Sequence, residues 1–114
     1  MERAQELEGY LTKIRDERLV SPAMAELAWT AWEQLSGNVG DLAVPDACPG
    51  PDGQLLFSWE REPHYLELEL FPDSPGEFFY RNDHTGTLWD CERRAGEPLA
   101  AEAAGKLALF VAGS

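Results

Sequence analysis

The clearest structural signal in the sequence is the stretch Tyr65-Leu66-Glu67-Leu68-Glu69-Leu70-Phe71. Apolar and polar residues alternate along it, and this two-residue period is typical of a β-strand with one face buried. Leu66, Leu68 and Leu70 are expected to face a core, because successive side chains of a strand point to opposite faces. Glu67 and Glu69 should therefore lie on the solvent side.

The segments on both sides of this strand predict an antiparallel meander. Residues 54–61 alternate in the same way, and Glu62-Pro63-His64 can reverse the chain. Further along, Pro72-Asp73-Ser74-Pro75-Gly76 and Asn82-Asp83-His84-Thr85-Gly86 are turn signals that separate two more short apolar segments. Since loops of this length join neighbouring antiparallel strands, we expect a four-stranded meander over residues 54–92.

Helical patterns flank the predicted sheet. Leu7, Leu11 and Ile14 recur at intervals of three and four, which indicates an amphipathic helix. Ser21-Pro22 is an N-cap followed by a proline in the first turn, so a second helix is expected from Pro22 until Gly37 ends it. Pro98 lies where a final helix would begin.

These elements predict a single α+β domain over residues 1–114. Its parts are a helical region of two helices at 1–37, a loop rich in proline and glycine at 38–53, the antiparallel sheet at 54–92 and a C-terminal helix at 97–112. Because helices and strands are segregated along the chain, we expect the C-terminal helix to pack on one face of the sheet.

The chain is strongly acidic. It contains 21 Asp and Glu against 9 Lys and Arg, a formal net charge of −12. A surface of this charge repels phosphate backbones, and no cluster of Lys and Arg offsets it, so direct nucleic-acid binding is not expected. The apolar stretches are far shorter than the roughly 20 residues needed to span a bilayer. A membrane segment is therefore not expected either.

No motif predicts catalytic chemistry. Cys48, His64, His84 and Cys91 lack the close pair spacing of most zinc-binding modules, and no nucleophile elbow is present. The chain has only two cysteines, and its N-terminus lacks the apolar stretch of a signal peptide. We therefore expect a cytoplasmic protein in which both cysteines are reduced thiols, whether or not they lie close together. We expect no enzyme activity and no catalytic, cofactor-binding or metal-binding residues.

The aromatic residues are more numerous than one sheet face can cover. Phe78 and Phe79 are neighbours in a predicted strand, so one of them must face away from the core. Exposed aromatic residues rimmed by charge commonly form protein-binding surfaces, and the acidic charge is densest over the same strands. The candidate partner-binding residues are Trp32, Tyr65, Glu67, Glu69, Phe71, Phe79 and Arg81.

The run from Pro51-Asp52-Gly53 through Trp59-Glu60, followed by Leu66-Glu67-Leu68-Glu69-Leu70, resembles a group of small, largely uncharacterised bacterial α+β proteins. These proteins combine a helical N-terminal part with a PDGG, W-E and LEIEI hairpin. The resemblance covers residues 20–92, without the W-D-G-type loop between the helices. It implies an accessory or partner protein rather than an enzyme.

The sequence thus predicts a non-enzymatic module that binds a basic protein, such as an antitoxin, an immunity or inhibitor protein, or a small subunit of a bacterial defence or regulatory complex. Two alternatives stay open at this point. One is a DNA mimic that occupies a nucleic-acid-binding protein, with phosphate spacing imitated by Glu60, Glu62, Glu67, Glu69, Asp73 and Glu77. The other is a small enzyme. The oligomeric state is also open, because an exposed edge of the meander could pair with its copy.

Overall fold

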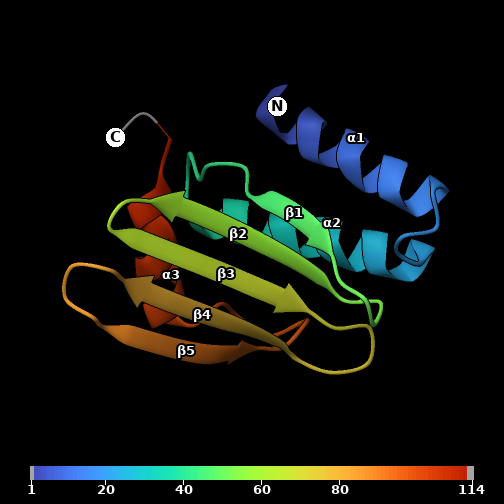
Figure 1. Ribbon diagram of the computed structural model, residues 1–114. Coiled ribbons are helices and arrows are strands. Elements are labelled where there is room, and N and C mark those ends of the chain that lie inside the picture. Colours follow the sequence, from blue (N-terminus) through green and yellow to red (C-terminus); the bar gives the residue numbers. More distant parts are fainter. Residues whose placement is uncertain (1, 113–114) are drawn as a thin grey trace.

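One antiparallel sheet of five strands organises the fold in the computed structural model, which describes residues 2–112 (Figure 1). Each strand neighbours the next along the chain, in the order β1-β2-β3-β4-β5. The strands are β1 (Asp46–Pro49), β2 (Leu55–Arg61), β3 (His64–Leu70), β4 (Gly76–Asn82) and β5 (Leu88–Arg93). Met1, Gly113 and Ser114 belong to the predicted domain but lie outside the described residues.

The predicted meander is confirmed for the four strands β2 to β5, but the prediction of four strands is wrong because β1 adds a fifth. β1 lies within residues 38–53, which were expected to form an irregular loop. It pairs with the side of β2 that faces away from β3, with Ala47 opposite Phe57 and Cys48 opposite Leu56. The strand is only four residues long and ends in Pro49, which an edge strand tolerates. Pairing with β2 therefore overrides a local composition typical of a loop.

Three helices accompany the sheet: α1 (Glu2–Asp16), α2 (Pro22–Asn38) and α3 (Ala101–Leu107), the last continued by the 3-10 turn η1 (Ala108–Phe110). The predicted cap is confirmed, because the Ser21 hydroxyl accepts a hydrogen bond from the Met24 amide at 3.0 Å. Gly37 does not end α2, which continues to Asn38. The C-terminal helix is shorter than predicted, because Gly96 has a positive φ and Ala100 is extended.

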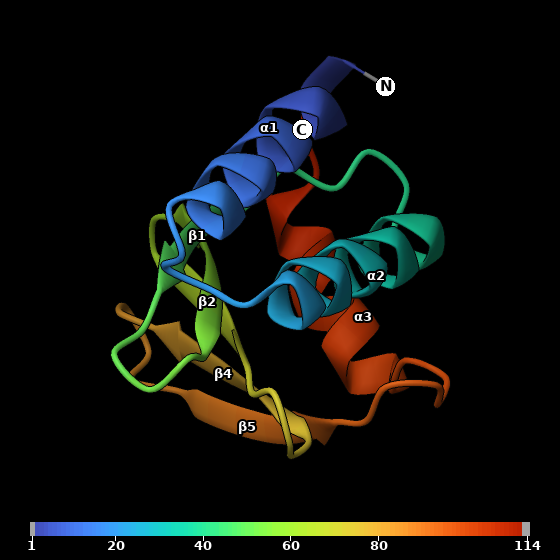
Figure 2. The same cartoon turned by 90° about the vertical axis from the view of Figure 1, so that its right-hand side faces the viewer.

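All three helices lie on one side of the molecule. Figure 2 shows α2 and α3 against one face of the sheet, and α1 beside β1. A single core cluster fills the space between the layers, and Leu66, Leu68 and Leu70 are at most 1% exposed within it. The predicted inward side of β3 is therefore confirmed. None of the helices in residues 2–112 has the length and apolar character needed to cross a membrane.

The two thiols lie far apart. Cys48 is on β1 and Cys91 on β5, so four strand spacings separate them, about 19 Å at the usual spacing of about 4.8 Å. A disulfide requires Cα atoms within about 7 Å. The two cysteines of one chain therefore cannot form a disulfide bond with each other.

Candidate partner-binding face

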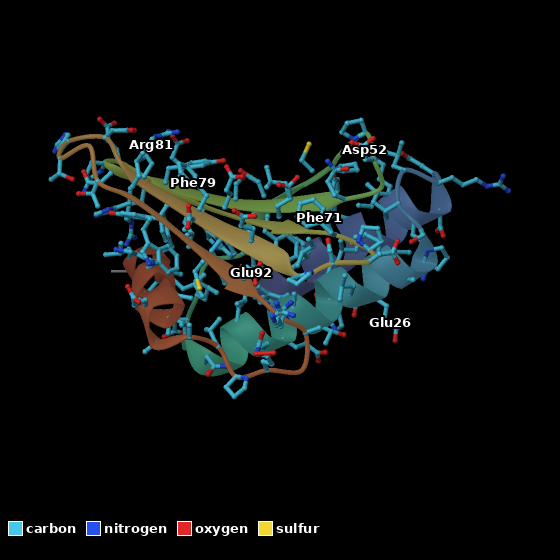
Figure 3. All side chains as sticks on the ribbon, turned by 90° about the horizontal axis from the view of Figure 1, so that it is seen from below. Glu26, Asp52, Phe71, Phe79, Arg81 and Glu92 are labelled. Carbon is cyan, nitrogen blue, oxygen red and sulfur yellow. The ribbon has the colours of Figure 1, made fainter. Side chains whose placement is uncertain are left out.

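The sheet face turned away from α2 and α3 is the candidate functional surface, and we call it the outer face. Leu66, Leu68 and Leu70 point inward, so the residues between them point outward, and the strand register extends this assignment to the other strands. Figure 3 shows Phe79 and Arg81 on this side and Glu26 of α2 on the opposite side. The outer face consists of Asp46, Cys48, Leu56, Ser58, Glu60, Tyr65, Glu67, Glu69, Glu77, Phe79, Arg81, Leu88, Asp90 and Glu92.

Three glutamates form one row across neighbouring strands of the outer face. Glu69 of β3 is directly opposite Glu77 of β4, which is directly opposite Glu92 of β5. Within the described part of the chain, the carboxylates of Glu69 and Glu77 have no ion pair or hydrogen bond, while the Glu92 carboxylate contacts Arg94 at 3.3 Å in an exposed pair. Like charges directly opposite each other destabilise a sheet. This acidic row therefore lowers stability, and exposed pairs such as Glu92–Arg94 offset little of it.

The next row places an aromatic side chain between two carboxylates. Phe79 of β4 is opposite Glu67 of β3 on one side and Asp90 of β5 on the other. Phe79 is half-buried although none of the helices that the structure describes covers this face (Figure 2). An aromatic ring flanked by acids is a combination found in protein-binding surfaces, where the ring supplies apolar contact and the charges select the partner.

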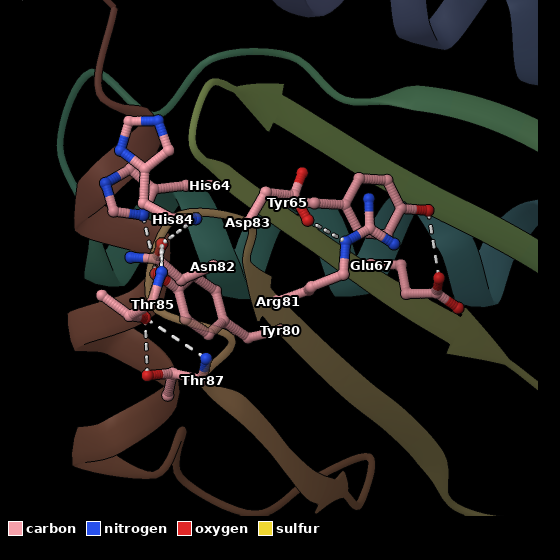
Figure 4. A network of polar contacts seen from close by, with 10 residues as sticks. All are labelled: His64, Tyr65, Glu67, Tyr80, Arg81, Asn82, Asp83, His84, Thr85 and Thr87. Atoms are coloured by element: carbon pink, nitrogen blue, oxygen red, sulfur yellow. Dashed lines mark hydrogen bonds and ion pairs between the residues drawn. The ribbon is translucent and has the colours of Figure 1, made fainter.

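A third row, Tyr65, Arg81 and Leu88, carries the cation of the outer face. The Arg81 guanidinium lies 4.7 Å from the centre of the Tyr65 ring, and its Nε donates a hydrogen bond to Asp83 at 2.7 Å (Figure 4). Tyr65 in turn donates its hydroxyl proton to Glu67 at 3.0 Å. Arg81 is thus engaged within the face, whereas Leu88 is 65% exposed.

The Tyr65 hydroxyl is expected to ionise at unusually high pH. Burial and the hydrogen bond to Glu67 raise the pKa of Tyr65 from 10.0 to about 12, and the charge of Arg81 opposes this shift. Because the pKa is raised in the folded state, the stabilisation is present below pH 10 and is lost as the pH rises through about 12. In an absorbance titration of tyrosinate, Tyr65→Phe should remove the step near pH 12, and Glu67→Gln should move it to lower pH. An unchanged titration in Tyr65→Phe would contradict this assignment.

The structure brings five of the seven predicted partner-binding residues together on the outer face: Tyr65, Glu67, Glu69, Phe79 and Arg81. Phe71 directly follows β3 and is half-buried beyond the end of the strand away from Tyr65. Trp32 is not on the outer face, because it lies in α2 within the core and is only 6% exposed. The apolar residues of α2 cover a wide arc, so periodicity alone did not show that Trp32 faces the sheet.

Leu88 and Asp90 also belong to the outer face but were not among the predicted partner-binding residues. Leu88 and Trp89 are adjacent apolar residues, so alternation within this segment does not decide which of them points outward. The register with β4 decides it, because Leu88 is opposite Arg81 on the outer side and Trp89 is opposite Tyr80 on the core side.

Polar side chains also gather at the turn between β4 and β5 (Figure 4). The Asn82 side-chain oxygen accepts hydrogen bonds from the amides of His84 at 2.9 Å and Thr85 at 3.1 Å, and Gly86 has a φ of 75°. The predicted reading of this segment as turn chemistry is confirmed, with Asn82 as the Asx residue. Near this turn, on the inner side, the His64 Nδ1 and the Tyr80 hydroxyl lie 2.6 Å apart.

These two histidines have different surroundings. His64 is half-buried, stacked on the Tyr80 ring and edge-on to Phe110, whereas His84 is exposed in the turn. Among the residues that the structure describes, no three His, Cys, Asp or Glu side chains come together where they could hold a metal ion.

Searches for a known protein family, for similar curated proteins and for similar solved structures found no match to this chain.

Proposed function

We propose that this chain is a non-enzymatic protein-binding module that engages a basic protein through its outer face. The acidic row is the observation that carries the proposal. Directly opposed carboxylates lower the stability of the sheet, and Glu69 and Glu77 have no compensating cation among the described residues. Local rules of folding are most often broken at functional sites. A basic partner would supply the missing cations.

The apolar members of the outer face support a protein as the partner. Phe79 lies between Glu67 and Asp90, and Leu88 at the edge of the face is 65% exposed. Aromatic and apolar side chains provide most of the affinity at protein interfaces, while charges provide specificity and fast association. The association rate should therefore fall as the ionic strength rises.

A role as a cytoplasmic antitoxin, an immunity or inhibitor protein, or a small subunit of a defence or regulatory complex fits this surface. The resemblance of residues 20–92 to small bacterial accessory proteins stays a prediction and agrees with such a role. A DNA mimic is less well supported, because Arg81, Tyr65 and Phe79 interrupt the carboxylates of the outer face. DNA should therefore not displace this chain from its partner. Displacement by DNA would favour the mimic instead.

Phe79→Ala is expected to weaken binding of the partner at least tenfold, because truncating a central aromatic contact commonly removes more than about 1.4 kcal/mol of binding free energy. The partner would be captured from cells of the native host, identified by mass spectrometry and titrated by calorimetry. Leu19→Ala is the matched control, because Leu19 is also an exposed apolar residue, 51% exposed, at the turn between α1 and α2. Equal affinities of wild type and Phe79→Ala would contradict the proposal.

A further inference from the structure

The two edges of the sheet differ in how they are protected. Edge strands expose unpaired backbone amides and carbonyls, and proteins usually protect them with short strands, prolines, lysines or a covering helix. β1 has three of these features: it has only four residues, it follows Pro45 and ends in Pro49, and α1 lies beside it (Figure 2). Leu7 and Tyr10 of α1 line a cavity of about 240 Å³ together with Pro45 and Ala47.

β5 lacks the same protection. It has six residues without proline or lysine. Within residues 2–112 it pairs only with β4, and no helix of this part of the chain lies along its other side (Figure 1). Half of the backbone amide and carbonyl groups of an edge strand in an antiparallel sheet point away from its neighbour. β5 can therefore accept another strand along about 20 Å, given the usual rise of about 3.4 Å per residue.

The side chains of β5 select which strand could be added. Asp90 and Glu92 point to the outer face, next to Phe79 and Glu77. A second copy of the chain paired antiparallel with β5 would bring two such pairs of carboxylates together, which is destabilising. A strand with Lys or Arg at alternate positions would instead place cations next to Asp90 and Glu92. These cations would offset part of the repulsion between the carboxylates of the acidic row.

The inner side of β5 offers an apolar complement. Trp89 is half-buried, 6.3 Å from the Phe78 ring between ring centres and 5.8 Å from the Lys106 amine. Arg93, the last residue of β5, is buried, and its Nε donates a hydrogen bond to Gln34 of α2 at 2.8 Å. The Arg93 guanidinium is therefore directed into the molecule and not toward an added strand. The inward-facing side chains of an added strand would contact Trp89 and Cys91.

We propose that the basic partner adds a β-strand to the free edge of β5, with Lys or Arg side chains at alternate positions toward the outer face and apolar side chains toward Trp89. This inference rests on the proposed function, because it specifies how the basic partner binds the outer face. Backbone hydrogen bonds to β5 supply affinity, and Asp90, Glu92 and Trp89 select the sequence of the added strand.

The test uses a blocked synthetic peptide of four Lys-Val repeats and the same peptide N-methylated at every amide. The two peptides have equal charge, but only the first can donate backbone hydrogen bonds. We expect the unmethylated peptide to slow hydrogen exchange of β5 amides and to bind at least tenfold more tightly than the methylated one. Asp90→Lys should weaken its binding at least tenfold, and Asp46→Lys, the same charge change on β1, by less than twofold.

Three other outcomes are possible, and each of them would overturn the inference in a different way. Equal binding of both peptides without protection of β5 amides would show that the outer face attracts cations but that β5 adds no strand. This result would reject the present inference and leave the proposed function standing. Failure of both peptides to bind would reject this inference, while the captured partner still tests the proposed function independently. A concentration-dependent dimer with protected β5 amides in the absence of peptide would identify a second copy as the occupant.

Discussion

Glu77→Lys is expected to weaken binding of the basic partner about a hundredfold while making the folded protein more stable. Placing a cation where the partner also has one costs several kcal/mol at an interface, and about 2.7 kcal/mol corresponds to a hundredfold change in Kd. In the free protein, the new lysine would lie directly between Glu69 and Glu92. Two repulsive cross-strand pairs would become attractive, so the free energy of unfolding should rise by about 1 kcal/mol.

Calorimetric titration of the partner and urea denaturation of the free protein would measure these two changes. Glu26→Lys is the matched control, because Glu26 is an exposed glutamate of α2 on the other side of the molecule (Figure 3). It should leave the affinity within a few-fold of wild type. Raising the ionic strength should stabilise the wild type more than Glu77→Lys, because salt screens the repulsion within the acidic row. A Glu77→Lys variant that is less stable and binds normally would refute the proposed role of this row.

Trp32→Ala is expected to lower the free energy of unfolding by about 3–5 kcal/mol, because it removes a large buried side chain and leaves a cavity. Trp32 belongs to the single core cluster and is 6% exposed. Since small domains are commonly stable by only about 5–15 kcal/mol, the variant should unfold at much lower urea concentration than the wild type. The affinity of the remaining folded protein for the partner should not change, since Trp32 lies on the opposite side of the sheet from the outer face.

Trp29→Ala provides the comparison within the same helix. Trp29 is only half-buried and lines a cavity of about 340 Å³ between α1 and α2, so its loss should be less destabilising. Denaturation curves would be recorded for both variants, and binding would be measured at a temperature where both are folded. Loss of affinity in folded Trp32→Ala, with stability unchanged, would place Trp32 in the binding surface after all.

Local patterns predicted most of the secondary structure. The alternation of Leu66, Leu68 and Leu70 identified β3 and its buried side, and Ser21-Pro22 identified the start of α2. These features could be predicted because side-chain periodicity and capping depend on residues within a few positions of each other. The same reasoning placed Glu67 on the outer side of β3 and required one of Phe78 and Phe79 to face away from the core. The structure shows that Phe79 is the outward one.

Other features depend on residues far apart in the chain, and only the tertiary structure decided them. Residues 46–49 form β1 because Ala47 and Cys48 find partners in β2, although their composition is typical of a loop. Trp32 faces the core because α2 packs on the sheet, and the acidic row exists because three strands align Glu69, Glu77 and Glu92. Sequence alone therefore determined which side of β3 is apolar. Packing and strand register between distant segments determined which residues contact each other. These contacts could not be predicted from the sequence, because their energies depend on residues that are far apart in the chain.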